Sequence, residues 1–198
     1  MRAGKRAFDM ISAAVGLVIL SPLFLAIAIA VKLDSAGPSF FRQERVGRGG
    51  EPFRIWKFRT MVADAERLGG VLTVGGDSRI TPVGAFLRRY KLDELPQLLN
   101  VIIGEMSFVG PRPEVAKYVA LYTREQKRVL DLMPGITDPA SLEFRDEGAA
   151  LAGRPDPERY YVAAVMPRKI ALNLEYARQA TLWSDVGIVL ATVSSLGR

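Results

Sequence analysis

Two adjacent acids, Asp93 and Glu94, begin the stretch of this chain in which chemistry-bearing residues are densest, Lys91 to Glu114. Pro96 in the next turn and Gly104 further on predict a short apolar helix that begins at the acidic pair. A carboxylate can attack phosphorus to form an acyl phosphate, and a neighbouring carboxylate can hold Mg²⁺. The simpler alternative is that Asp93 only caps this helix, while Glu94 adds charge to its first turn.

Basic side chains near the acidic pair favour a site for phosphate. Arg88 and two further basic residues precede the pair, and Arg112 follows it within a Pro-Arg-Pro sequence. Arginines bind phosphate oxygens through forked hydrogen bonds. Upstream, Lys57 and Arg59 are two residues apart, so on a strand both side chains would point the same way and could hold one phosphate.

Composition narrows the chemistry that is available. The 198 residues carry a net charge of +6, which suits phosphates, nucleic acid or anionic lipid as partners. Because the chain has no histidine and no cysteine, an imidazole base, a Ser-His-Asp triad, a thiolate nucleophile and disulfides are all excluded. A carboxylate nucleophile is therefore chemically reasonable, and any metal would be a hard cation bound by oxygens.

An uncharged apolar run, Met10 to Val31, lies near the start of the chain. As a straight helix these 22 residues would rise roughly 33 Å, enough to cross a bilayer. Ser21-Pro22 near its middle predicts a kink, and the serine hydroxyl can satisfy a carbonyl that the kink frees. Basic residues flank the run on both sides, which favours a re-entrant helix-break-helix over residues 1–34. A kinked spanning helix is the alternative.

Residues 35–198 are expected to form one domain of the α+β class, mainly helical with a small sheet. The helix expected over 82–90 carries apolar and basic residues, so it is either an interfacial amphipathic helix at the membrane or an ordinary surface helix. The other expected segments are a loop with a short extended part over 35–52, a strand or helix start over 52–61, helices over 61–68, 114–133 and 160–180, a charged loop over 138–156, and an apolar stretch over 181–196.

Short motifs occur in a fixed order along most of the chain. They are Lys5-Arg6 with Asp9, Ser21-Pro22, Gly37-Pro38, Phe41-Arg42-Gln43, Lys57-Phe58-Arg59-Thr60-Met61, Asp77-x-Arg79-Ile80-Thr81, Leu92-Asp93-Glu94-Leu95-Pro96-Gln97-Leu98, Gly104-Glu105-Met106-Ser107, Val109-Gly110-Pro111-Arg112-Pro113-Glu114 and Pro134-Gly135-Ile136-Thr137. In this order they resemble the bacterial monotopic phosphoglycosyl transferases, which initiate glycan assembly. Each fragment is weak by itself, but the ordered set is highly specific.

This resemblance implies a reaction. The family transfers a sugar 1-phosphate from a UDP-sugar to undecaprenyl phosphate and releases UMP. By resemblance, Asp93 attacks the β-phosphorus and carries the phosphosugar covalently, while Glu94 helps to bind Mg²⁺. The basic residues that match the family are expected to contact phosphates or the nucleotide; they are Lys57, Arg59, Arg88 and Arg112.

The resemblance also implies a location. The re-entrant helix broken at Ser21 and Pro22 would keep the enzyme in one leaflet of the bacterial inner membrane, among phospholipids. The catalytic domain, residues 35–198, would face the cytoplasm as a minimal catalytic unit. The product would pass to downstream glycosyltransferases of a polysaccharide, O-antigen or glycoprotein pathway, and no nucleic acid is expected as a partner.

One segment departs from the family pattern. Many members continue Pro-Gly-Ile-Thr with Gly-x-Ala-Gln-Val, whereas this chain continues with Asp138-Pro139-Ala140-Ser141 and reaches Arg145. Arg145 is kept as a candidate phosphate-binding arginine. The identity of the sugar stays open, because the pocket around this segment could differ.

Two other functions remain as alternatives. A membrane-anchored basic module that binds nucleic acid or anionic lipid without catalysis would explain the net charge and the apolar run. It would not explain a Pro-Arg-Pro sequence beside an acidic pair. An enzyme with a spanning helix that transfers only the sugar would release UDP rather than UMP.

Overall fold

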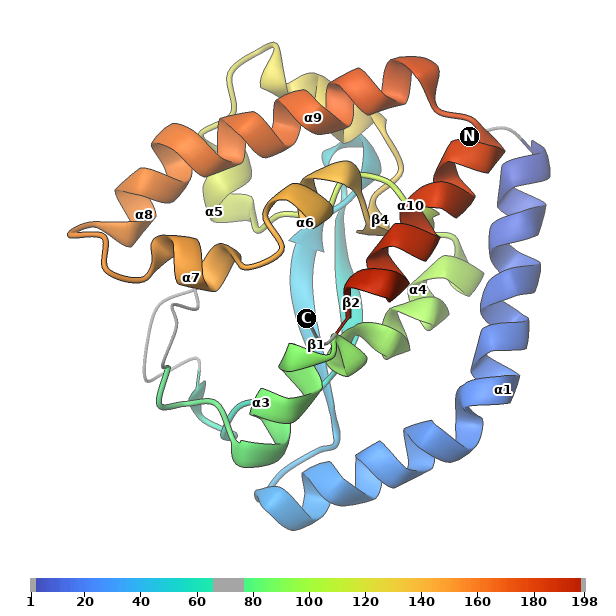
Figure 1. Cartoon of the computed structure of the whole chain (residues 1–198), viewed down its shortest axis with the longest axis vertical. Helices are drawn as coiled ribbons and strands as arrows, with labels where there is room; N and C mark the ends of the chain where they lie inside the picture. The colour runs from blue at the N-terminus through green and yellow to red at the C-terminus, as the bar shows by residue number, and fades with distance from the viewer. Residues whose placement is uncertain (1–2, 66–76, 197–198) are drawn as a thin grey trace.

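The computed structural model describes residues 3–65 and 77–196, which form a mixed α+β fold that is mainly helical (Figure 1). The predicted fold class is confirmed at this level. The elements in chain order are α1 (Ala3–Asp34), β1 (Phe40–Val46), β2 (Pro52–Phe58), α3 (Pro82–Arg89), the 3₁₀ helix η2 (Leu92–Gln97), α4 (Leu98–Ile103), β3 (Ser107–Val109), α5 (Ala116–Val119), the 3₁₀ helix η3 (Gln126–Asp131), β4 (Gly135–Thr137), α6 (Pro139–Glu143), α7 (Glu147–Leu151), α8 (Pro157–Tyr160), the π-helical η4 (Tyr161–Val165), α9 (Met166–Gln179) and α10 (Leu182–Ser195), with a short 3₁₀ turn η1 (Arg48–Gly50) between the first two strands.

Helix α1 is long and apolar, and it bends near its middle (Figure 1). Pro22 has no N–H to donate to the carbonyl of Val18, and the Ser21 hydroxyl donates to that carbonyl instead at 2.8 Å. The predicted kink is therefore present, with the predicted use of the serine, but the helix is bent rather than interrupted. Of the described helices, α1 alone is long and apolar enough to cross a membrane.

The first two strands form an antiparallel hairpin in which Phe40 pairs with Phe58 and Val46 with Pro52. The strand alternative for 52–61 is thus correct, and the extended part predicted within 35–52 is β1. Ile55 from β2 packs in a core with Ala13 of α1 and with Val101 and Met106, which follow the acidic pair. The hairpin therefore holds the acidic segment against the apolar helix.

Two local predictions are wrong. Residues 114–133 are not one helix: α5 ends at Val119, and η3 begins separately at Gln126. Thr123 and Gln126 exchange hydrogen bonds in the turn between them, where each backbone N–H donates to the other's side chain. The charged stretch 138–156 is not a loop: Asp138 caps α6 and Asp146 caps α7. Asp138-Pro139 and Asp146-Glu147 are typical helix starts, but the many charged residues of this stretch favoured a loop.

Other predicted helices are present. Helix α3 begins after Thr81, whose side chain accepts from the Gly84 N–H at 3.0 Å. The run over 157–179 is helical, and its π-helical turn η4 ends just before Pro167. The helix expected over 61–68 lies outside the described residues from 66 onward, and Met61 itself pairs with Ile80 in an isolated bridge.

The Pro-Arg-Pro segment is held by a parallel pair of short strands, β3 and β4. A Cβ at Gly110 would lie 2.1 Å from the carbonyl oxygen of Met133, so only glycine permits this close approach of the two segments. The Gly110 N–H donates to Thr137 and the Gly135 N–H donates to Pro111. The backbone on both sides of Arg112 is therefore fixed by the fold.

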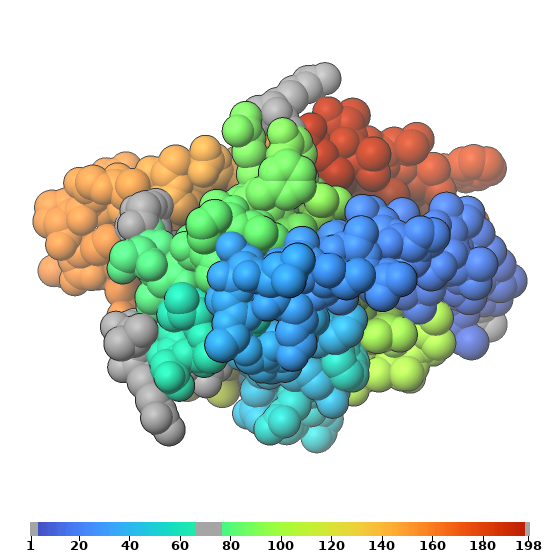
Figure 2. Space-filling view, turned by 90° about the horizontal axis from the view of Figure 1, so that it is seen from below, coloured from blue at the N-terminus to red at the C-terminus, as the bar shows by residue number. Residues whose placement is uncertain are grey.

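The outer face of α1 is strongly apolar. Figure 2 shows α1 extended across the face seen from below, with α3 beside it and α10 on a neighbouring side. Large exposed apolar side chains on these helices include Val18 and Leu33 of α1, Phe86 of α3 and Trp183 of α10. An exposed apolar surface of this kind is typical of membrane-associated proteins.

Candidate active site

The acidic pair lies in the first turn of η2, with both carboxylates buried: Asp93 is 6% and Glu94 8% exposed. Lys91, in a left-handed conformation with φ 55°, occupies the N-cap position. No side-chain hydrogen bond caps this helix, so the alternative in which Asp93 serves as its N-cap is wrong. The two side chains need another explanation for their burial.

Glu94 is paired with two cations. Its Oε2 accepts from Nη1 of Arg112 at 2.8 Å, its Oε1 accepts from Nη2 of the same guanidinium, and Lys57 Nζ lies 3.2 Å from Oε1. Burial by itself would raise the pKa of Glu94, but Arg112 and Lys57 outweigh it and hold that pKa well below its usual range. Glu94 in turn raises the pKa of Arg112. The carboxylate is held ionised in a fixed orientation.

Asp93 has the opposite environment. Among the described residues, none donates a hydrogen bond or forms an ion pair to its carboxylate. Burial raises its pKa, the charge of Glu94 raises it further, and Lys57 and Arg88 only partly oppose this. A buried carboxylate with no committed partner, surrounded by cations at longer range, is suited to attack an electrophile.

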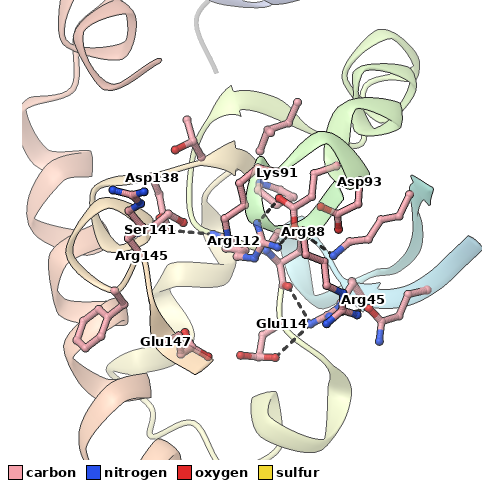
Figure 3. A pocket seen from close by; sticks show the side chains of 18 of the residues that line it. Arg45, Arg88, Lys91, Asp93, Arg112, Glu114, Asp138, Ser141, Arg145 and Glu147 are labelled. Atoms are coloured by element: carbon pink, nitrogen blue, oxygen red, sulfur yellow. Dashed lines mark hydrogen bonds and ion pairs between the residues drawn. The ribbon is translucent and has the colours of Figure 1, made fainter. Parts of the chain in front are cut away.

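The acidic pair and all five predicted basic residues line one cavity of about 1320 Å³. In Figure 3, Arg88 and Asp93 lie on one side of Arg112, and Asp138, Ser141 and Arg145 lie on the other. The predicted site residues that line the cavity are Lys57, Arg59, Arg88, Asp93, Glu94, Arg112 and Arg145. Residues from five separate segments of the chain thus meet at one site.

Arg59 does not join the phosphate-facing cations as predicted. Its guanidinium donates to the carbonyls of Val31, Ser35 and Ala36 at the end of α1. Strand β2 ends at Phe58, so the alternation that would align Arg59 with Lys57 stops one residue too early. Arg59 is used as a cation at a helix C-terminus instead.

Lys57 and Arg88 are both held close to the acids. Burial lowers the pKa of Lys57 against the effect of Glu94, and burial also lowers the pKa of Arg88 against the effect of Asp93. Arg88 donates from Nε to the Thr60 hydroxyl at 2.8 Å, which orients its guanidinium. The cations are therefore partly desolvated, which strengthens their attraction for phosphate oxygens.

Sequence reasoning missed further residues of this site. Arg45 lines the cavity, and its Nη1 lies 3.4 Å from Oε1 of Glu114. The other carboxylate oxygen of Glu114, Oε2, accepts from the Tyr161 hydroxyl. Burial lowers the pKa of Arg45. The alternation of β1 could have indicated that Arg45 shares a face with Gln43 and Phe41. Nothing local pointed to Tyr161.

The acidic pair also fits a divalent cation. The described residues contain no cluster of three or more acids that could form an all-protein metal site. Mg²⁺ commonly binds through one or two carboxylates plus substrate phosphates, and two adjacent carboxylates in a cation-lined cavity match that need.

The chain is similar to known proteins along its whole length. The family model described as bacterial sugar transferase matches residues 1–198. The chain is 39% identical over 203 residues to the UDP-glucose:undecaprenyl-phosphate glucose-1-phosphate transferase of Caulobacter vibrioides, covering 97% of this chain and 69% of that protein. It is 37% identical over 195 residues to the UDP-N-acetylgalactosamine-undecaprenyl-phosphate N-acetylgalactosaminephosphotransferase of Aeromonas hydrophila, covering 97% of this chain and 43% of that protein.

A third relative is the exopolysaccharide production protein ExoY of Rhizobium meliloti, 33% identical over 207 residues, with 97% of this chain and 84% of that protein covered. The chain thus spans less than half of one relative and most of another. The family model covers every residue, and the similarity to each of the three relatives includes nearly the whole chain. This chain belongs to the bacterial sugar transferase family.

Proposed function

We propose that this protein transfers a sugar 1-phosphate from a UDP-sugar to undecaprenyl phosphate and releases UMP. The names of its relatives support both substrate classes. The observation that carries the proposal is the buried carboxylate of Asp93, which has no committed partner among the described residues and lies beside a paired Glu94. Chemistry by a carboxylate nucleophile needs this combination.

The proposed reaction has two displacements. A carboxylate oxygen of Asp93 attacks the β-phosphorus, and the bond from that phosphorus to the oxygen bridging the two phosphates breaks, so UMP leaves with that oxygen. The phosphosugar is then an acyl phosphate on Asp93. An oxygen of undecaprenyl phosphate attacks the same phosphorus, which restores the carboxylate and forms a diphosphate-linked sugar.

In this proposal Glu94 would help to hold Mg²⁺, which would neutralise charge on the transferred phosphate. Glu94 is oriented for this role by Arg112 and Lys57. The cations of the cavity bind the phosphate oxygens that do not react, and Arg88 contributes from its position beside Thr60. Arg145 does so from the opposite side of the cavity (Figure 3).

Residues 1–34 serve in the proposal as a re-entrant membrane helix and residues 35–198 as the catalytic domain on the cytoplasmic face of the inner membrane. The bend in α1 and the exposed apolar side chains of α1 and α3 support contact with phospholipid. The product would enter glycan assembly through downstream glycosyltransferases. The relative named for exopolysaccharide production supports a polysaccharide as that glycan.

The by-product of the reaction tests this function. A panel of UDP-sugars is incubated with the protein, Mg²⁺ and a polyprenyl phosphate, and the released nucleotide is identified. UMP that forms with at least one sugar is the expected result. UDP as the released nucleotide would indicate transfer of the sugar alone. If no sugar in the panel gives either nucleotide, and the protein binds nucleic acid with a steep salt dependence, the non-catalytic alternative is correct.

The topology needs a separate test. Because the chain has no cysteine, one introduced thiol gives a unique label. Gly4→Cys and Ser35→Cys place thiols on the two sides of the apolar run. A re-entrant helix predicts that an impermeant reagent added to intact spheroplasts labels neither, whereas labelling of Gly4→Cys alone would demonstrate a spanning helix.

A further inference from the structure

Asp138 is a fully buried carboxylate between β4 and α6, with an exposed fraction of 0%. Both of its oxygens accept hydrogen bonds. Oδ1 accepts from the Ser141 N–H at 2.5 Å, and Oδ2 accepts from the Arg112 N–H at 3.1 Å and from Nδ2 of Asn173 at 2.7 Å. One side chain therefore joins three segments: the Pro-Arg-Pro segment, the start of α6 and the middle of α9.

A helix cap by itself does not explain this arrangement. Asp146 and Asp156 cap α7 and α8 with one hydrogen bond each, and both are exposed. Complete burial of a third cap would cost free energy unless other donors compensate for the lost water. At Asp138 the additional donors are the amide of Arg112 and the side chain of Asn173. The second oxygen of Asp138 thus has a separate task.

That task concerns Arg112, which is held at both ends. Pro111 and Pro113 carry no N–H, so Arg112 supplies the only backbone donor between them, and it donates to Asp138. The guanidinium at the other end of the same residue forms the bidentate pair with Glu94. In Figure 3, Arg112 lies between Asp93 and Asp138. A shift of its backbone would move the guanidinium away from Glu94.

We propose that Asp138 is a positioning residue for the reaction, which acts through the backbone amide of Arg112 and so directs the Arg112 guanidinium to Glu94 and to substrate phosphate. Asp138 is also the first residue at which this chain departs from the usual family pattern. The expected effect of Asp138 on turnover rests on the proposed function. The hydrogen bond to the Arg112 amide can be tested without turnover.

A double-mutant cycle tests the effect on turnover. Asp138→Asn keeps the shape but presents one acceptor oxygen and an amide group to three N–H donors, so the Arg112 segment loses its fixed position. We expect kcat/KM, normalised to folded protein, to fall about 10- to 100-fold, as is typical when a group that orients a reacting residue is lost. Asp156→Asn makes the same chemical change at an exposed cap remote from the cavity and should stay within about 2-fold of the unchanged protein.

The cycle is completed with Arg112→Lys and the double variant Arg112→Lys with Asp138→Asn. If Asp138 acts through Arg112, the double variant should be no more than about 3-fold worse than the poorer single variant, because the second change removes nothing further. A role confined to stability predicts that Asp138→Asn loses no activity per folded molecule, and a role independent of Arg112 predicts that the two losses multiply. Either outcome would overturn the proposal.

Hydrogen exchange provides a readout that is independent of activity. Between Pro111 and Pro113 the Arg112 amide is the only exchangeable backbone position. Its protection should decrease in Asp138→Asn and stay unchanged in Asp156→Asn. Protection that is equal in all three proteins would refute the proposal even if turnover fell. Should the unchanged protein turn over no UDP-sugar, the proposed function fails while this measurement still decides whether Asp138 holds Arg112.

A milder variant, Asn173→Ala, provides the test if Asp138→Asn does not fold. Asn173→Ala removes one donor from Asp138 and leaves its carboxylate bonded to the Arg112 amide. We expect a loss of roughly 3- to 10-fold in kcat/KM with the same lack of additivity toward Arg112→Lys. Multiplying losses in this cycle would also contradict the proposal.

Discussion

Two buried charged clusters in this protein differ in whether each of their carboxylates has a hydrogen-bond donor. The anchor cluster consists of Lys5, Asp9 and Asp185 and joins the start of α1 to α10. Lys5 pairs with Asp185 and lies 3.6 Å from Asp9, whose Oδ2 accepts from the Ser107 hydroxyl at 2.7 Å. Asp185 also accepts from the hydroxyl of Tyr176 at 2.5 Å. Every carboxylate of the anchor cluster therefore has a committed donor.

The acidic-pair cluster, which we propose to be catalytic, consists of Lys57, Asp93, Glu94 and Arg112. Here Glu94 takes both cations, while Asp93 receives no hydrogen bond from the residues that the structure describes. Burial together with the charge of Glu94 raises the pKa of Asp93. The fold tolerates a buried acid whose charged form is disfavoured.

The difference supports the proposal that the acidic-pair cluster performs the chemistry. A structural cluster satisfies each buried charge, because an unpaired one destabilises the fold. A reacting group must keep its lone pairs available, so the fold accepts a local loss of stability there. Substitutions in the acidic-pair cluster should therefore lower activity more than stability, and substitutions in the anchor cluster should lower stability more than activity.

The largest expected effect is on activity, at Asp93. Asp93→Asn should lower turnover by on the order of 10⁴-fold or more, as is typical for loss of a residue that reacts covalently. The free energy of unfolding near neutral pH should stay the same or rise by about 1 kcal/mol, since an unpaired buried charge is removed. Turnover assays and denaturant unfolding in detergent measure the two quantities. Full turnover by Asp93→Asn, or a strongly destabilised variant, would erase the distinction between the clusters.

The reverse pattern is expected at Asp185. Asp185→Ala leaves Lys5 and the Tyr176 hydroxyl without their main partner, and breaking such a buried pair costs about 3 kcal/mol of unfolding free energy. Turnover per folded molecule should change by less than about 3-fold, because no atom of the anchor cluster lines the cavity. A selective loss of turnover at unchanged stability would show that the anchor cluster also serves the reaction.

The pH dependence of stability sharpens the comparison. The folded-state pKa of Asp93 is raised above the ordinary value of 3.8, so the stability that its neutral form contributes is present at low pH and is lost as pH rises through the raised pKa. Asp93→Asn has no such loss. Its stability relative to the unchanged protein should therefore increase with pH above about 4, as unfolding measured over a pH series would reveal. A relative stability that decreases over this range would mean that Asp93 is stabilised as a charged group.

The smallest expected effect concerns the bend of α1. In Ser21→Ala the carbonyl of Val18 loses the donor that replaces the missing N–H of Pro22. We expect a loss of about 1 kcal/mol in unfolding free energy and turnover within about 2-fold. Thermal unfolding of Ser21→Ala beside Ser194→Ala, which removes a similar hydroxyl bond at the exposed end of α10, provides the matched comparison. Equal unfolding temperatures for the two variants would mean that the serine adds nothing at the bend.

Local signals in the sequence were sufficient for the kink of α1, for α3 and for the acidic helix, because proline, cap residues and apolar periodicity act over a few residues. They failed for 114–133, where apolar residues suggest one helix but the hydrogen bonds between Thr123 and Gln126 form a turn. They also failed for the short capped helices α6 and α7. Their Asp caps were read as part of a charged loop.

The proximity of the candidate residues was predictable where one short segment carries several of them, as with Asp93, Glu94 and Arg112, which line one cavity. Arg59 was misassigned because a strand end shifts by one residue without any local sign. The contacts of Asp138 with Arg112 and Asn173 join residues far apart in the chain, and no pattern within a window of sequence encodes them.

The proposal that Asp93 carries the phosphosugar covalently can be tested directly. A UDP-sugar labelled with ³²P at its β-phosphorus is incubated with the protein in the absence of polyprenyl phosphate, and the label on denatured protein is mapped to a peptide. We expect label on the peptide that contains Asp93 and loss of this label when polyprenyl phosphate is added. We expect no protein-bound label in Asp93→Asn. Turnover to UMP without any protein-bound label, or label that persists in Asp93→Asn, would contradict it.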